Sequence, residues 1–251
     1  MRPKPPEIVN RKSEIARVVR FPIVDFRFAA VLAIAAFASA CEPVGTVLTD
    51  FKKQPKLDPW ETPESMYYGA ALAALATGIA PADYQARPEI RQNVAALTAY
   101  LRSEQAAQPL HNRLTLLWAS TKLRDLLASD QRAALLDEVW GKQQADGGWT
   151  LESLGAFKKH PEAPPSAGSN GYATALVAFT VQTAGTVRSN PGLAKALAWL
   201  RAHQDQQIGD WSADSMNKQR DPDSMPARFM RDAATGFATL ALLEAGQTGT
   251  K

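Results

Sequence analysis

Metal binding and acid–base catalysis require histidine, cysteine and carboxylate side chains at short, regular spacings. This sequence has three histidines, His111, His160 and His203, and a single cysteine, Cys41. No two of these residues stand at a spacing typical of metal ligands, so we predict no metal site and no cofactor. A single cysteine also excludes a disulfide within the chain.

One carboxylate stands where an apolar helix is expected to begin. Asp232 follows Arg231 and precedes the run AATGFATLALLEAG. Protonating an isolated double bond requires a neutral carboxylic acid inside a dry cavity. Arg231 and the positive end of the helix dipole both favour the charged form of Asp232. Asp232 is therefore only a weak candidate for a catalytic acid, and the catalytic residues stay unassigned.

The charge of the chain is unevenly distributed. The net charge of +3 comes from 28 basic and 25 acidic residues, and residues 1–27 carry seven of the former and three of the latter. The remaining residues hold 21 basic and 22 acidic side chains, so the body of the chain is close to neutral. We therefore expect no nucleic-acid partner, because such a partner requires a basic surface.

An uncharged run, FAAVLAIAAFASA at 28–40, follows the basic segment and ends at Cys41. Its thirteen residues are too few to span a bilayer as a helix, but they fit the apolar core of a secretory signal. The ASAC sequence resembles a bacterial lipoprotein processing site, in which Cys41 would carry the lipid anchor, although Ala38 stands where leucine is typical. We predict a leader at 1–48 and a place in the cell envelope. The alternative is a cytoplasmic protein in which this run is a buried helix.

The rest of the chain has a helical pattern. Leucines and alanines recur at spacings of three and four residues, and strand-type alternation is absent. We therefore predict an all-α domain. A Gly/Pro-rich segment at 155–171 and a polar loop at 212–232 interrupt the helices. The predicted helices are 66–78, 88–105, 110–129, 130–144, 172–185, 190–204 and 231–246.

Two kinds of helix alternate. The uncharged segments 66–78, 172–185 and 233–246 are expected to be buried all round, whereas 88–105, 130–144 and 190–204 carry charge on one face and are expected to lie outside them. The uncharged helices also align without gaps, as YGAALAAL, YATALVAF and FATLALLE, which begin at Tyr68, Tyr172 and Phe237. Such a repeat predicts a ring or solenoid of helical hairpins.

A second repeat follows two of the outer helices. The stretch KALAWLRAHQDQQIGDW at 195–211 ends in a glutamine, a glycine and a tryptophan, and KQQADGGW at 142–149 repeats that ending. The glutamine amide can bond backbone groups that the helix end leaves unpaired, the glycine allows a sharp turn, and the tryptophan packs on the helix end. We predict a structural clamp of Gln143, Gly147 and Trp149, repeated by Gln204, Gly209 and Trp211.

These residues resemble the QW motif of squalene–hopene and oxidosqualene cyclases. The stretch 195–211 matches it throughout, 142–149 matches its second half, and YLRSEQ at 100–105 matches its first half. The resemblance covers about Pro59 to Gly246 and implies a squalene-cyclase-like α/α toroid at 49–251. Closed toroids of this kind have more hairpins. The resemblance therefore implies an open partial toroid, a ring that residues 1–58 or a partner chain completes, or a piece of a longer protein.

The chemistry of this group of folds lacks its key residues here. Squalene–hopene cyclases use an Asp-x-Asp-Asp cluster, and the nearest segment, GSNGYATAL at 168–176, has no carboxylate. The zinc ligands of protein prenyltransferases and the Cys–Gln pair of thioester domains are also missing from the repeats. We therefore expect a non-catalytic binding or scaffold module. The alternative is a divergent terpene cyclase that acts on an isoprenoid substrate.

The resemblance also implies where a ligand would bind. In such toroids the ligand lies where the inner helices begin, and aromatic rings at that rim suit an apolar or cationic molecule, such as an isoprenoid. The alternative is that the tyrosines only pack between hairpins. The candidate ligand-binding residues are Tyr67, Tyr68, Asn170, Tyr172, Asp232 and Thr235.

Overall fold

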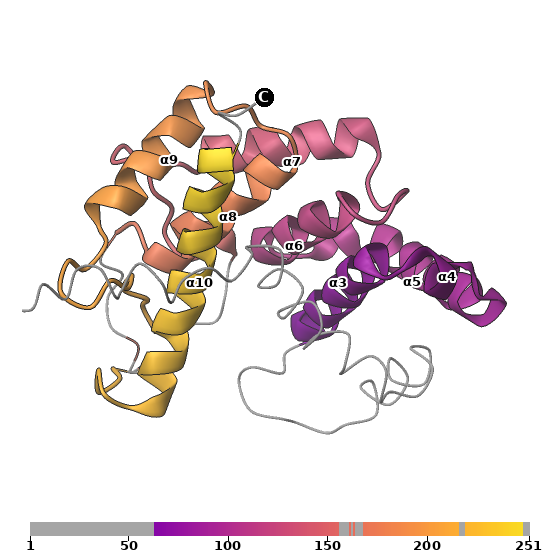
Figure 1. The fold of residues 1–251 in the computed structure, drawn as a ribbon, viewed down its shortest axis with the longest axis horizontal. Helices are drawn as coiled ribbons and strands as arrows, with labels where there is room; N and C mark the ends of the chain where they lie inside the picture. The colour runs from indigo at the N-terminus through magenta and orange to yellow at the C-terminus, as the bar shows by residue number, and fades with distance from the viewer. Residues whose placement is uncertain (1–62, 156–160, 162, 164–167, 216–218, 248–251) are drawn as a thin grey trace, which may run out of the picture. The chain divides into compact units, whose positions relative to one another are not determined.

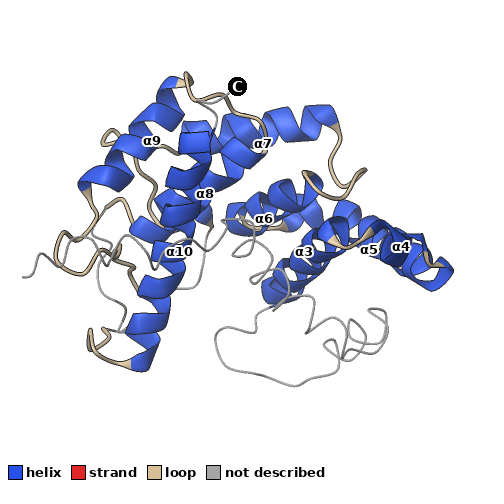
Figure 2. Cartoon of the chain, viewed as in Figure 1, coloured by secondary structure: helices blue, strands red, loops and turns tan. Residues whose placement is uncertain are grey.

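A computed structural model describes residues 63–155, 161, 163, 168–215 and 219–247 (Figure 1). Figure 2 shows helices and connecting turns in this part of the chain and no strand, which confirms the all-α prediction. The α-helices are α3 (Pro63–Ile79), α4 (Ala82–Ala86), α5 (Pro88–Glu104), α6 (Leu110–Ser120), α7 (Ser129–Gly141), α8 (Gly171–Thr183), α9 (Pro191–Ala202) and α10 (Met225–Gln247). Two single 3-10 turns are η3 (Gln105–Ala107) and η4 (Glu152–Leu154).

Local sequence signals explain several helix starts. Helices α5 and α9 begin with proline, whose missing N–H costs nothing in the first turn. Asparagine side chains cap α8 and α9, because Asn170 accepts from the backbone N–H of Ala173 at 3.2 Å and Asn190 accepts from that of Leu193 at 3.0 Å. These caps set the starting residues of two adjacent helices.

The helix predicted at 110–129 is too long. Helix α6 ends at Ser120, and the backbone N–H groups of Lys122 and Leu123 both donate to the carbonyl of Ala119 at 2.9 Å. Asp125 then takes a left-handed conformation with φ of 64°, which a continuing helix excludes. The tight turn therefore separates α6 from α7 within a stretch whose leucine spacing is helical throughout.

Four of the described helices contact one another in a row. Helix α6 packs against α3 and α8, and α8 packs against α10, so these helices form a row. Helices α5, α7 and α9 pack against α3, α6 and α8, respectively. Figure 1 shows α10 crossing in front of α8, with α9 to one side of them.

Helix α8 is the centre of the larger core, whereas α10 is buried on only part of its surface. Every residue from Ala173 to Val181 is buried, as expected for an uncharged helix. The prediction that 233–246 is buried all round is wrong, because Leu240 and Leu243 are exposed. Helix α10 has α8 as its main partner among the described helices, so one of its faces lacks a covering neighbour.

Helix α10 also begins earlier than predicted. It starts at Met225, so residues 225–232 are helical and the predicted loop 212–232 is shorter than expected. The hydroxyl of Ser224 lies 3.4 Å from the backbone N–H of Ala227, and Pro226 fits the first turn. The polar composition of this segment suggested a loop, but Ser224 and Pro226 are residues that favour the start of a helix, so α10 begins there.

All the described residues belong to one contact unit, Glu42–Lys251. The predicted leader at 1–48, with its apolar run and Cys41, lies outside the described residues. None of the helices that the structure describes combines the length and the apolar character that crossing a membrane requires.

Candidate functional site

Two tryptophans make the same contact with the helix that precedes them. Trp149 is fully buried, and its indole N–H donates to the carbonyl of Val139 at 2.9 Å in the last turn of α7. Trp211 is 3% exposed, and its indole N–H donates to the carbonyl of Leu200 at 2.7 Å in the last turn of α9. Each indole therefore bonds a carbonyl in the last turn of an outer helix, where i→i+4 partners run out, and the Val139 carbonyl also accepts from the backbone N–H of Lys142 at 3.2 Å.

The backbone of each tryptophan also bonds a threonine on the following inner helix. The N–H of Trp149 donates to Thr174 Oγ1 at 3.0 Å, and that of Trp211 donates to Thr235 Oγ1 at 3.2 Å. The ungapped sequence alignment instead matches Thr174 with Thr239. The structural counterpart thus lies one helical turn earlier, which shows that the repeat is offset between α8 and α10.

The glutamines close the turn between each helix and its tryptophan. Gln143 Nε2 donates to the carbonyls of Gly147 and Gly192, both at 2.8 Å, and Gln204 Nε2 donates to the carbonyl of Gly209 at 2.9 Å. Gly147 and Gly209 have φ values of 98° and 80°, which glycine adopts without strain. Because Gly192 lies in α9, the first glutamine also connects α7 to the next outer helix.

Asp146 extends this connection, and the sequence analysis did not identify it. Its Oδ1 accepts from the backbone N–H of Gly148 at 3.0 Å and from Ser169 Oγ at 2.7 Å, while Oδ2 accepts from Trp199 Nε1 at 3.1 Å. Partial burial opposes ionisation of Asp146, but these donors and the nearby His203 hold its pKa below the ordinary value. An Asp-Gly-Gly turn before a tryptophan is the signal that could have identified Asp146.

Three of the candidate ligand-binding residues have side-chain hydrogen bonds to backbone groups of the fold. Tyr67 is fully buried, and its hydroxyl donates to the carbonyl of Leu101 in α5 at 2.8 Å. Asn170 caps α8, and its own N–H donates to the carbonyl of Trp149 at 2.8 Å. Thr235 accepts from Trp211. Tyr67 and Thr235 therefore connect inner helices to neighbouring segments through their side chains, and Asn170 does so through its backbone N–H.

Asp232 does not stand at the start of a helix. It is an exposed residue inside α10, seven positions after Met225, so the helix dipole argument no longer applies to it. Arg231 Nε pairs with Asp210 Oδ2 at 3.1 Å instead. The prediction of Asp232 at an inner-helix start is wrong, because the helix begins in the segment predicted to be a loop.

Aromatic side chains of the inner helices contact one another in sequence. Tyr68 of α3 lies 5.3 Å from His111 of α6 between ring centroids, and His111 lies 6.0 Å from Tyr172 of α8. Tyr172 then contacts Phe237 of α10 edge to face at 5.7 Å. Trp118 and Phe179 continue the contacts, at 6.2 Å and 6.1 Å from Phe237. We call this set the aromatic seam: Tyr68, His111, Trp118, Tyr172, Phe179 and Phe237.

The seam has two polar groups at its centre. A hydrogen bond of 2.9 Å joins His111 Nε2 to the Tyr172 hydroxyl. Burial lowers the pKa of His111, although its hydrogen bond with Asn112 opposes that shift. Burial also raises the pKa of Tyr172 and of Tyr68. The apolar surroundings of the seam thus favour the neutral forms of His111, Tyr172 and Tyr68.

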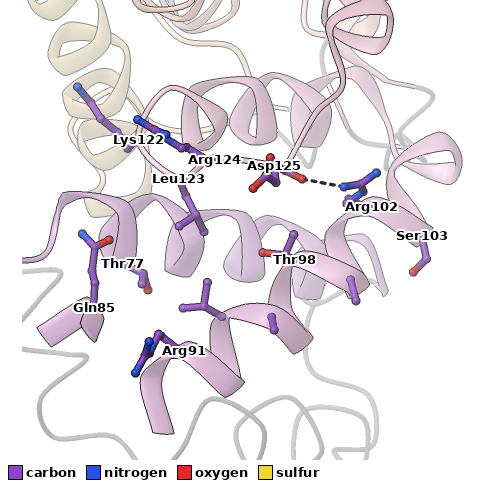
Figure 3. A pocket seen from close by; sticks show the side chains of 13 residues that line it. Thr77, Gln85, Arg91, Thr98, Arg102, Ser103, Lys122, Leu123, Arg124 and Asp125 are labelled. Carbon is purple, nitrogen blue, oxygen red and sulfur yellow. Dashed lines mark hydrogen bonds between the residues drawn. The ribbon is translucent and has the colours of Figure 1, made fainter. Parts of the chain in front are cut away.

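A groove lies apart from the seam, between α5 and the turn that follows α6 (Figure 3). Its volume is about 970 Å³. We call it the α5 groove. Its lining residues are Thr77, Gln85, Arg91, Val94, Ala95, Thr98, Ala99, Arg102, Ser103, Lys122, Leu123, Arg124 and Asp125.

Within the described part of the chain, no cluster of three or more histidine, cysteine, aspartate or glutamate side chains is placed to hold a metal ion. No protein-family model, no curated protein and no solved structure matches this chain. The case for a function therefore depends on the geometry of the clamps, the seam and the groove.

Proposed function

We propose that this chain is a non-catalytic binding module of the squalene-cyclase-like α/α-toroid type, and that the aromatic seam binds an apolar ligand such as an isoprenoid. The observation that carries the proposal is the continuity of the seam. Its rings come from α3, α6, α8 and α10, which are the consecutive helices of the inner row. A surface of this kind offers aromatic faces and edges over several helices to one apolar molecule.

The repeated clamps support the toroid part of the proposal. Trp149 and Trp211 each bond the last turn of an outer helix and a threonine of the next inner helix. The same device at two successive hairpins is what a repeat architecture requires. The row of contacts that begins at α3 and ends at α10 supports the open form of such a toroid.

The polar groups of the seam favour binding over acid catalysis. His111 and Tyr172 bond each other, and burial favours their neutral forms. A neutral phenol or imidazole is a far weaker acid than alkene protonation requires. Asp232, the weak candidate for the acid, is exposed on α10 and contributes no ring contact or hydrogen bond to the seam.

Binding can be measured by the quenching of tryptophan fluorescence, since Trp118 belongs to the seam. Detergent-solubilised squalene and farnesol serve as probes. Phe237→Ala should weaken binding by about tenfold, because it removes a central ring of the seam. The matched control is Phe229→Ala, which removes a 72% exposed phenylalanine from the same helix and should leave binding unchanged. Phe237→Leu keeps the core volume and tests whether the effect comes from the ring.

Two results would contradict the proposal. Equal effects of Phe237→Ala and Phe229→Ala would place the ligand away from the seam. A cyclised product, found by analysis of the squalene incubation, would instead support the alternative of a divergent terpene cyclase. The product analysis must include Asp232→Asn, because activity that this variant loses would give the carboxylate a catalytic role despite its exposure.

A further inference from the structure

Four cationic side chains surround the α5 groove. Arg91 and Arg102 come from α5, and Lys122 and Arg124 come from the turn after α6. All four are exposed, and none forms an ion pair with another residue that the structure describes. The one carboxylate among the lining residues is Asp125. The groove therefore has an excess of positive charge although the body of the chain is close to neutral.

One face of α5 forms a wall of the groove. Arg91 and Arg102 are separated by eleven residues, or about three helical turns, so they lie on the same face about 16 Å apart. Val94, Ala95, Thr98 and Ala99 lie between them on that face and are mostly small or apolar. The wall thus combines a cation near each end with an apolar middle.

The opposite wall has the same combination. Figure 3 shows Leu123 pointing from the turn into the groove, whereas the charged ends of Lys122 and Arg124, which line the rim, extend away from α5. Arg102 Nη1 donates to the backbone carbonyl of Asp125 at 3.3 Å, which holds this turn against α5. Cations at the rim and apolar side chains inside suit a molecule that has both an anionic and an apolar part.

We propose that the α5 groove binds an amphiphile whose head group is a phosphate. Arginine pairs with phosphate through two parallel hydrogen bonds, and several cations match the double charge of a phosphate monoester better than the single charge of a carboxylate. The volume of about 970 Å³ is within the range of small-molecule sites. This site shares no residue with the aromatic seam, so it does not depend on the function proposed above.

Titration calorimetry of the full chain with dodecyl phosphate, below its micelle concentration, tests this site. The variant Arg91→Gln/Arg102→Gln should weaken binding by about tenfold or more. The matched control Arg188→Gln/Arg201→Gln removes the same charge from exposed positions outside the groove and should change the affinity by less than about twofold. Ala95→Leu keeps the charge, fills the apolar middle and should also weaken binding.

Two further probes separate the head group from the chain. Inorganic phosphate and dodecyl maltoside should both bind more weakly than dodecyl phosphate, since each lacks one of the two parts. Sedimentation with phosphatidylcholine vesicles that contain phosphatidic acid identifies the source of the ligand. Retention by these vesicles indicates a lipid head group, and binding of dodecyl phosphate without retention indicates a free phosphate ester.

Several results would overturn the proposal. They are no heat of binding with dodecyl phosphate, equal binding of dodecyl maltoside, equal binding of inorganic phosphate, or the same loss of affinity in the groove variant and the control. Circular dichroism and thermal melting of each variant confirm that it is folded. The altered side chains are exposed, so we expect at most a small decrease in melting temperature, largest for the groove variant because it loses the hydrogen bond from Arg102 to the Asp125 carbonyl.

Discussion

Trp199 of α9 donates its indole N–H to Asp146 Oδ2 at 3.1 Å and stacks on His203 with ring centroids 3.9 Å apart. Asp146 belongs to the turn before Trp149, whereas Trp199 belongs to the helix before Trp211. The hydrogen bond therefore joins one clamp to the next. Gln143 makes a parallel connection through the carbonyl of Gly192. The two clamps are thus coupled by side chains as well as by the packing of their helices.

A double-mutant cycle measures this coupling. Asp146→Ala and Trp199→Phe should each lower the free energy of unfolding by about 1–2 kcal/mol, because both remove the hydrogen bond between the exposed Asp146 and the buried Trp199. Asp146→Ala also removes the bonds from Gly148 and Ser169, so its loss should be the larger of the two. The double variant should lose about 1 kcal/mol less than the sum. Urea denaturation followed by circular dichroism provides the measurement. Full additivity would mean that the two clamps are independent.

The two clamp glycines offer a second prediction. Gly209→Ala should cost about 1–2 kcal/mol, because φ of 80° is strained for alanine while the added Cβ has only Gln204 Nε2 within 4 Å, at 3.9 Å. Gly147→Ala should cost about 1–3 kcal/mol more, since its Cβ would also lie 2.9 Å from Lys195 backbone and side-chain atoms.

Gly141→Ala is the matched control for this series. Gly141 ends α7 with ordinary helical backbone and nothing within 4 Å of an added Cβ, so alanine should be neutral or slightly stabilising there. Melting temperatures in the order Gly141→Ala, Gly209→Ala, Gly147→Ala, from highest to lowest, are expected. If Gly147→Ala melted at a higher temperature than Gly209→Ala, a clash with Lys195 would not be what destabilises the Gly147 variant.

Trp211→Ala tests the clamp itself. The ring is 3% exposed and bonds Leu200, so its loss should cost about 3–5 kcal/mol of unfolding free energy. Phe229→Ala, at a 72% exposed position, should cost less than about 0.5 kcal/mol. A loss below about 1 kcal/mol for Trp211→Ala would show that the turn is held by other contacts.

Whether a helix is buried could be predicted from the sequence where its capping residue and its uncharged composition both match its place in the fold. Asn170 followed by an uncharged run specifies both the start and the burial of α8. An uncharged run does not by itself determine burial. In helix α10 the segment FATLALLE resembles the α8 sequence, but two of its leucines, Leu240 and Leu243, are exposed. Burial depends on the number of neighbouring helices, which the composition of one helix does not determine. The turn at Asp125 could not be predicted, because the leucines on both sides of it recur at helical spacing throughout 110–129.

The candidate site was predictable only in part. The Gln, Gly and Trp positions follow from the repeat, whereas Asp146 and its partners come together only after the loop packs on α9. The aromatic seam includes Tyr68 and Tyr172 from the predicted ligand-binding residues. Its other members, which that prediction did not include, are His111, Trp118, Phe179 and Phe237. The groove was missed because Arg91 and Arg102 share a helical face that Lys122 and Arg124 meet only in the folded chain.

The last prediction concerns His111 and pH. Burial lowers the pKa of His111 below its ordinary value of 6.5, so the unfolded chain binds a proton there at a higher pH than the folded chain does. Stability is unaffected by this group above that pH and decreases as the pH falls below about 6.5, by up to about 1.4 kcal/mol per pH unit. The carboxyl groups of Glu138 and Asp146, whose pKa values are lowered, titrate well below this range.

His111→Gln should therefore flatten the decrease in unfolding free energy between about pH 7 and pH 5, measured by urea denaturation at each pH. The glutamine amide can still bond the Tyr172 hydroxyl, so the variant should remain folded. If His111→Gln left the decrease unchanged, the buried imidazole would not be the group that titrates. The neutral character assigned to the centre of the seam would then be wrong.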